Sequence, residues 1–217
     1  MKIKNIACSW SGGKDCCFAL MEAKSMGYTP KVLLSMVDED LKTSRSHGLP
    51  VSILEEQAEA MNLTLLATPS SRNDYEQNFI KALKCLKTDF EIETIVFGDI
   101  DLIAHYEWLE RVCRIAGIEP VFPLWNRKRE VLAKEIVNSG IKSMIVSCNE
   151  RLGESYLGKI YSSELIEELK PMSVCPCGED GEFHSFVIDG PLFQYQVSIP
   201  KLPAKKVDDF YFIDWGI

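Results

Sequence analysis

Apolar positions along the chain form short runs that alternate with stretches of helical periodicity. The runs at 31–37 and 63–68, and a shorter one at 94–97, are typical of strands buried on both faces. Apolar residues recur at steps of three and four over 79–90 and 102–116, which predicts amphipathic helices there. The alternation predicts a parallel sheet, because parallel strands need crossover helices between them.

The first strand and helix are separated by a glycine turn. The run Lys2–Ser9 predicts a strand that stops at Trp10–Gly13, and the helix that follows contains Phe18–Met21 and can be capped by Gly27. With a short strand at Val121-Phe122, we expect residues 1–125 to form a doubly wound α/β domain with a parallel five-stranded sheet. Ligands of such sheets bind beyond the carboxyl ends of the strands.

Residues 126–217 have a different pattern of apolar and polar positions. A helix is expected near 131–137 and a strand at 143–147. The segments 183–188 and 192–199 alternate in polarity on either side of a turn, which predicts an antiparallel hairpin. We therefore expect a smaller, β-containing C-terminal lobe packed on the first domain.

Composition and charge narrow the class of protein. The chain has 217 residues, of which 46% are hydrophobic, and its 24 Lys and Arg against 32 Asp and Glu give a net charge of −8. No run reaches the ~20 apolar residues of a membrane helix, and the acidic balance argues against binding nucleic acid. The eight cysteines and the absence of a cationic, apolar leader predict a reduced, cytoplasmic protein.

The run Ser11-Gly12-Gly13-Lys14-Asp15 carries the clearest chemistry. A glycine turn between a strand and a helix directs several backbone N–H groups at one point, which suits a phosphate, and Lys14 adds a full charge. The spacing fits neither the Walker A motif nor Gly-x-Gly-x-x-Gly. It resembles the pyrophosphate loop (PP-loop) of the N-type ATP pyrophosphatases, which have the adenine nucleotide α-hydrolase-like fold and cleave ATP between its α and β phosphates.

Further motifs resemble one family within that superfamily. They are Arg45-Ser46-His47-Gly48, Phe97-Gly98-Asp99-Ile100, Arg111 with Gly117, Phe122-Pro123-Leu124-Trp125, and the segment Cys177–His184. They follow the order seen in the diphthine–ammonia ligase-like family, whose founding activity completes diphthamide on elongation factor 2. The resemblance implies an ATP-dependent amide-forming ligase, in which a carboxylate is adenylated, pyrophosphate leaves and ammonia displaces AMP.

The resemblance also implies ligands and residue roles. ATP and Mg²⁺ are the expected cofactors, and the partners are ammonia and a carboxylate acceptor, either a small molecule or a modified protein side chain. The resemblance leaves open whether the protein forms a homodimer. The residues assigned to ATP binding are Ser9, Ser11, Gly12, Gly13, Lys14, Asp15, Cys16, His47, Gly98 and Asp99. Among them, residues 11–14 would hold the departing phosphates, and Asp15 and Asp99 would hold Mg²⁺.

The late segment is the expected site for the acceptor and ammonia. Glu179, Glu182 and His184, with Lys14 and Asp15, are the candidate catalytic residues, since the first three could orient ammonia or take its proton. The alternative is an acidic, solvated turn. Diphthamide-forming members have Gly-Glu-Gly-Gly-Glu-Tyr-Glu-Thr here. This chain instead has Gly178-Glu179-Asp180-Gly181-Glu182-Phe183-His184-Ser185. In this difference it resembles a bacterial branch thought to act on other small carboxylates, including in cobamide salvage.

Several single residues have two interpretations. Cys16 replaces the Ser common in the superfamily, and its thiol either packs against the loop or is a reactive group with a lowered pKa. His47 either contacts a ligand or ends a loop. Asp101 either binds a ligand beside Asp99 or caps a helix, whereas His105 is expected to be structural.

Two other functions fit parts of the pattern. A tRNA-thiolating sulfurtransferase would use Cys16, Cys175 and Cys177, although the chain has no Cys-x-x-Cys pair and a net negative charge. A non-catalytic nucleotide-binding module would need less of a pyrophosphate clamp than Lys14 and Asp15 provide. Structural zinc at Cys175-x-Cys177 is disfavoured by the short spacing and the lack of a second ligand pair.

Overall fold

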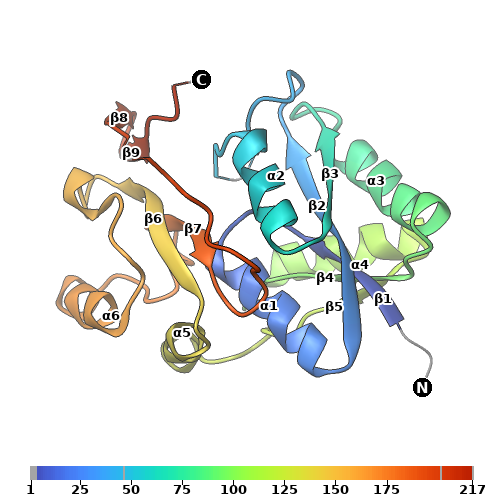
Figure 1. Cartoon of the computed structure of the whole chain (residues 1–217), viewed down its shortest axis with the longest axis horizontal. Helices are drawn as coiled ribbons and strands as arrows, with labels where there is room; N and C mark the ends of the chain where they lie inside the picture. The colour runs from blue at the N-terminus through green and yellow to red at the C-terminus, as the bar shows by residue number, and fades with distance from the viewer. Residues whose placement is uncertain (1–3, 46, 201, 217) are drawn as a thin grey trace.

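The first half of the chain forms a parallel sheet whose strand order is β3-β2-β1-β4-β5 (Figure 1). The computed structural model describes residues 4–45, 47–200 and 202–216, so the start of the predicted first strand and Ser46 lie outside the described residues. The strands are β1 (Lys4–Ser9), β2 (Tyr28–Val37), β3 (Thr64–Pro69), β4 (Thr94–Val96) and β5 (Glu119–Val121). All adjacent pairs are parallel, which confirms the predicted fold class.

Helices cover both faces of this sheet. On one face, α1 (Lys14–Ser25) and α2 (Val51–Ala60) share a core with Ile6 and Cys8 of β1. On the other face, α3 (Tyr75–Asp89) and α4 (Ile103–Ala116) form a second core together with other sheet residues. The alternation of side chains along β1 between the two cores explains why its central residues Ile6, Ala7 and Cys8 are all apolar.

The C-terminal lobe contains an antiparallel sheet in the order β7-β6-β9-β8. Its strands are β6 (Lys142–Asn149), β7 (Phe183–Asp189), β8 (Ala204–Val207) and β9 (Phe210–Ile213). The predicted hairpin of 183–188 with 192–199 is wrong: β7 pairs with β6, and the hairpin is formed by β8 and β9. After the turn, the chain instead bonds to the end of α2, where Gln194 N donates to the Ala60 carbonyl.

The remaining helices belong to this lobe, with one on its outer side and one in contact with α1 (Figure 1). They are α5 (Arg129–Asn138), α6 (Ser163–Leu169) and two short 3₁₀ turns, η1 (Glu154–Tyr156) and η2 (Lys170–Met172). The sequence analysis missed α6, although Ser162 caps it by accepting from Leu165 N. No helix in the described ranges is long and apolar enough to cross a membrane.

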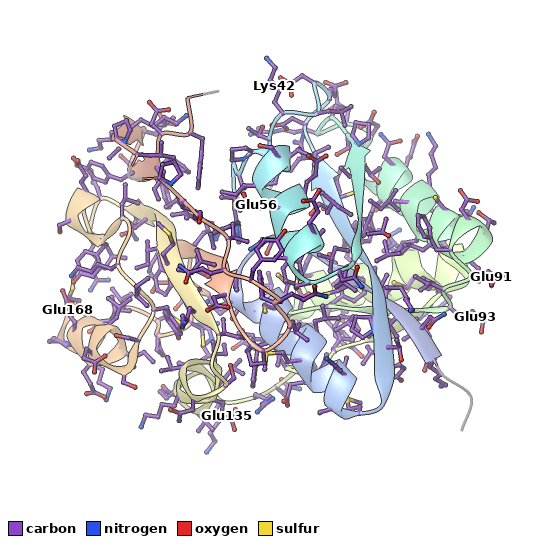
Figure 2. All side chains as sticks on the ribbon, viewed as in Figure 1. Lys42, Glu56, Glu91, Glu93, Glu135 and Glu168 are labelled. Atoms are coloured by element: carbon purple, nitrogen blue, oxygen red, sulfur yellow. The ribbon has the colours of Figure 1, made fainter. Side chains whose placement is uncertain are left out.

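Acidic side chains lie on the periphery of the molecule. Figure 2 shows Glu91 and Glu93 at one end and Glu168 at the other, and all three are exposed. These three charges are thus solvated, as is usual for charged residues.

Helix α1 lies between the two sheets and joins them (Figure 1). Val187 N of β7 donates to the Gly12 carbonyl over 2.9 Å, and Lys14 N donates to Ser185 Oγ over 3.1 Å. One continuous core cluster contains residues of α1, α2, α5, α6 and both sheets. The glycine loop is therefore fixed by the C-terminal lobe as well as by its own sheet.

Gln57 of α2 is a fully buried polar residue at this junction. Its amide nitrogen donates to the carbonyls of Gly12 and Val187 over 3.1 and 2.6 Å, and its oxygen accepts from Trp10 Nε1 over 2.8 Å. Buried polar groups need such partners, and each partner stranded by a substitution costs free energy. Gln57 therefore stabilises the contact between the two lobes.

We expect Gln57→Leu to lower the free energy of unfolding by about 2–4 kcal/mol, because it strands buried groups of Trp10 and Val187. Denaturant unfolding followed by tryptophan fluorescence measures this change. Glu59→Leu, at an exposed position of the same helix, is the control and should change stability by less than about 0.5 kcal/mol. Equal effects of the two substitutions would contradict the assigned role of Gln57.

Candidate active site

A cavity of about 320 Å³ lies beyond the carboxyl ends of β1, β2 and β4, and we call it the strand-end cavity. Its volume is within the range of small-molecule sites. Its polar lining comes from Ser9, Ser11, Asp15, Cys16, Arg45, Gly98, Asp99, His105 and Glu179, and its apolar lining from Trp10, Leu34, Met36, Tyr75 and Phe97. It lies at the position expected for ligands of a doubly wound sheet, where β1 separates two oppositely progressing halves.

The glycine loop, residues 11–13, leads into α1 beside this cavity. Gly13 is the N-cap residue of α1, and Gly12 has φ of +82°, a conformation that favours glycine. A Cβ at Gly98 would lie only 2.7 Å from Cys16 N and 2.8 Å from the Asp15 carbonyl carbon. Gly98 thus allows the end of β4 to approach the first turn of α1 closely.

Lys14 is buried, and its ammonium group points toward the C-terminal lobe. Nζ donates to Asp15 Oδ2 over 2.8 Å and to the Cys177 carbonyl over 2.5 Å. Burial alone would lower the pKa of Lys14, but the nearby Asp15 charge, with smaller contributions, outweighs it and raises the pKa. Lys14 is not among the residues that line the strand-end cavity.

A second cavity of about 230 Å³ lies between the glycine loop and the segment 177–185, and we call it the inter-lobe cavity. Its lining includes Lys14, Asp15, His47, Glu179 and His184. The remaining lining residues are Cys177, Gly178, Gly181, Phe183 and Ser185. Two carboxylates, those of Asp15 and Glu179, line both cavities and mark the boundary between them.

The pKa values of several ionisable groups that line the inter-lobe cavity are shifted. Desolvation and the neighbouring Asp15 charge raise the pKa of Glu179 to about 7, although the side chain can be reached from the cavities. Burial, followed by the charge of Lys14, lowers the pKa of His184. Burial and then His184 lower the pKa of His47. Such shifts are typical of functional sites, although structural networks also produce them.

Asp15 and Asp99, the two expected Mg²⁺ ligands, both line the strand-end cavity. Asp15 Oδ1 is buried and has no hydrogen-bond partner, whereas Asp99 Oδ1 contacts His105 Nδ1. Two carboxylates with a free oxygen suit a hard cation such as Mg²⁺. The residues present thus fit the expected metal.

His105 was expected to be structural, yet it lines the strand-end cavity and contacts Asp99. Its ring stacks on Trp108 with centroids 5.6 Å apart. The Asp99 contact, opposed by burial, raises the pKa of His105. Sequence position alone could not reveal this, because the contact depends on how the β4–α4 loop turns.

Glu182 lies outside both cavities. Its buried carboxylate accepts from Cys175 N over 2.7 Å and from Asp180 N over 3.1 Å, so it holds the loop 175–182 in shape. Ligand atoms of Cys175, Asp180 and Glu182 lie within 4.8 Å of one another, but hydrogen bonds already engage the carboxylate of Glu182. The geometry therefore favours a structural part for Glu182, in contrast to its predicted catalytic one.

Arg129 ties the same loop to the first sheet. Its guanidinium donates to both oxygens of Asp101 over 2.7 and 2.8 Å and to Asp180 Oδ1 over 2.8 Å. Asp101 is therefore an ion-pair partner, and the N-cap of α4 is Leu102, so the capping alternative is wrong. Sequence reasoning missed Arg129 because its partners are 28 and 51 positions away.

Cys16 packs against the glycine loop. Its thiol donates to the Gly13 carbonyl over 3.1 Å, and burial, the largest influence, raises its pKa. A reactive thiolate is thus disfavoured. Arg111 lies on the surface and pairs with Glu76 across α3 and α4.

Comparison with known proteins agrees with the resemblance. A sequence model of the diphthamide synthase N-terminal domain matches residues 3–120, and one of the diphthamide synthase C-terminal domain matches residues 128–217. Together they cover almost the whole chain.

Similar proteins carry one name. The diphthine–ammonia ligase of Homo sapiens is 28% identical in an alignment of 222 positions, and the alignment covers 89% of this chain and 82% of that protein. That of Danio rerio is 24% identical, covering 87% and 84%, and that of Schizosaccharomyces pombe is 26% identical, covering 86% and 34%.

Solved structures are more distant. One from Methanocaldococcus jannaschii, described as a "predicted subunit of tRNA methyltransferase", has a TM-score of 0.48 and 16% identity and covers 87% of this chain and 98% of that one. The U34-tRNA thiolase NcsA from Methanococcus maripaludis has a TM-score of 0.40 and 12% identity, covering 62% and 56%. Likeness at this level says nothing about substrates.

We expect Glu182→Gln to speed hydrogen exchange of a loop amide, at Cys175 or Asp180, by about tenfold, because one N–H loses its carboxylate acceptor. Exchange measured by NMR at single residues tests this. Glu179→Gln is the matched control, since Glu179 lines the cavities instead of bonding these amides. Unchanged exchange in Glu182→Gln, or equal acceleration in the control, would remove the structural assignment.

Proposed function

Because the chain belongs to the diphthamide synthase family, we propose that it is an ATP-dependent ligase that joins ammonia to a carboxylate. The relatives named diphthine–ammonia ligase support a ligase, and the two adjoining cavities support a reaction with two binding steps. Adenylation, ammonia transfer and the residue roles below are parts of this proposal.

ATP binds in the strand-end cavity. The apolar side chains of Leu34, Met36 and Tyr75 offer a surface for the adenine ring, and the loop residues Ser9 and Ser11 offer polar contacts. The N-terminus of α1 favours the negative charge of the phosphates. When bound, Mg²⁺ would be held by Asp15 and Asp99 and would offset the charge of the departing pyrophosphate.

The carboxylate acceptor approaches from the inter-lobe cavity. The observation that carries this is the shared boundary, since Asp15 and Glu179 line both cavities. An acceptor there can reach the α phosphate of ATP without leaving the site. Attack by its oxygen releases pyrophosphate and leaves a mixed anhydride with AMP. Residues 1–125 then supply most of the nucleotide site, and residues 126–217 supply the acceptor side.

Lys14 supports both sides of this reaction. Its charge lies beside Asp15, at the boundary, and its bond to Cys177 fixes the acceptor loop. A fixed cation at the place where charge develops stabilises a transition state. The acceptor is diphthine or another carboxylate of similar chemistry.

The thiol groups do not favour sulfur transfer. Cys16, Cys175 and Cys177 are all buried, and burial above all raises the pKa of Cys177 to about 12. A protonated thiol is a poor nucleophile. All eight cysteines are free in the structure, in keeping with a reducing compartment such as the cytoplasm.

The products of ATP turnover test the proposal. We expect AMP and pyrophosphate, formed only with Mg²⁺ and stimulated by the correct carboxylate. Chromatography of the nucleotides, in a screen of diphthine and small carboxylic acids, measures this. ADP and orthophosphate as the first products would overturn the proposal.

Removing the charge of Lys14 should be costly. We expect Lys14→Ala to lower kcat/KM by about 10²–10³-fold, as for loss of one preorganised charge-stabilising donor. Cys16→Ser is the neighbouring control and should stay within a few-fold of the original, because Ser preserves the hydrogen bond to Gly13. An inactive Cys16→Ser with an active Lys14→Ala would place the chemistry on the thiol. Circular dichroism checks that both variants fold.

A further inference from the structure

The inter-lobe cavity contains two of the three histidines of the chain. The rings of His47 and His184 are stacked, with centroids 4.4 Å apart and an angle of 28° between their planes. His47 comes from the segment after β2, and His184 comes from β7. The pair therefore forms only when the two lobes are together.

The surroundings of both imidazoles favour the neutral form, because they lower the pKa of each ring. Burial, His184 and Lys14 lower the pKa of His47, and burial and Lys14 lower that of His184. Asp15 opposes the shift of His184, and a hydrogen bond with the backbone of Ser185 opposes that of His47. Two stacked cations beside a buried ammonium group would repel one another, so the geometry agrees with this protonation state.

The cavity offers hydrogen-bond acceptors that the protein does not use. The His184 ring lines the cavity and stacks on His47, and it makes no hydrogen bond within the described part of the chain. His47 Nδ1 is among the described buried atoms without a partner, and His47 lines this cavity. The strongest donor there, Lys14 Nζ, is already engaged by Asp15 and Cys177. The lining therefore suits a small ligand that donates hydrogen bonds.

We propose that the inter-lobe cavity binds ammonia, and that His184 takes the proton that makes it a nucleophile. This inference rests on the proposed function and adds the place and the proton acceptor for the nitrogen substrate. Ammonium carries four N–H donors and no acceptor, which complements the free imidazole nitrogen and the carboxylates of Asp15 and Glu179. His47 is a positioning residue that holds the His184 ring by stacking on it.

The proposed step conserves atoms and charge. Ammonium gives one proton to the imidazole nitrogen of His184, and the resulting ammonia attacks the carbonyl carbon of the acyl adenylate. A C–N bond forms and the C–O bond to AMP breaks, so AMP leaves with the electron pair. The second proton leaves the nitrogen for solvent.

The histidine count allows a direct binding test. Only His47, His105 and His184 contribute imidazole signals, and His105 lines the strand-end cavity as an internal control. The intact protein is titrated with ammonium chloride at pH 7 and, separately, with sodium chloride at equal ionic strength. Titrations are made with and without Mg²⁺ and α,β-methylene ATP. Ring signals are followed by NMR and assigned from His47→Gln, His105→Gln and His184→Gln.

We expect ammonium to shift the His184 signals saturably and several-fold more than sodium does, with His105 much less affected. No ammonium-specific shift at His184 in either titration, or an equal shift with sodium, would overturn the proposal. The nucleotide analogue should shift His105. If it does while ammonium shifts nothing, the ammonia site fails and the proposed function stands; if His105 does not respond, the nucleotide assignment itself fails.

Kinetics separate proton transfer from a merely structural part. Once an acceptor is known, we expect His184→Gln to raise the KM for ammonia and lower kcat at least tenfold, while ATP affinity stays within a few-fold. His47→Phe preserves a stacking ring and should therefore lower kcat less than His47→Ala does. Normal ammonia kinetics in His184→Gln, or loss of ATP binding in that variant, would contradict the assignment.

Discussion

The buried ammonium group of Lys14 is the contact on which the candidate site depends. A buried cation must be paired, and Lys14 finds its partners in Asp15, on its own helix, and in the Cys177 carbonyl of the other lobe. Separation of the lobes would leave this charge without the carbonyl. The requirement therefore brings the loop 175–182 against the glycine loop, and Glu182 and Arg129 hold that loop in its own shape.

The shared boundary of the two cavities follows from this contact. Lys14 draws the segment after Cys177 over the first turn of α1, which puts Glu179 beside Asp15. The desolvation that results raises the pKa of Glu179 to about 7. A reaction between a nucleotide on one side and a carboxylate on the other then needs no large movement, which is the advantage of holding reactants together.

Local sequence patterns correctly predicted the elements whose apolar residues form one stripe along a helix or one unbroken run along a strand. The apolar run of β2 and the helical period of α4 are examples, and the turn Ser11–Gly13 was correctly placed between a strand and a helix. Alternation at 192–199 was misleading because partner choice decides whether such a segment is a strand, and here the chain bonds to α2. The short strands β8 and β9 carried too few residues for a clear pattern.

The candidate site was less predictable, because its key contacts join distant positions. Motif order pointed to Asp15, Glu179 and His184, which the structure brings into one cavity. A crystal structure with α,β-methylene ATP and Mg²⁺ tests the account most directly, because that analogue cannot be cleaved between its α and β phosphates. The account predicts adenine in the strand-end cavity and the α phosphate at the boundary between Asp15 and Glu179. A nucleotide bound elsewhere, or with its phosphates filling the inter-lobe cavity, would contradict it.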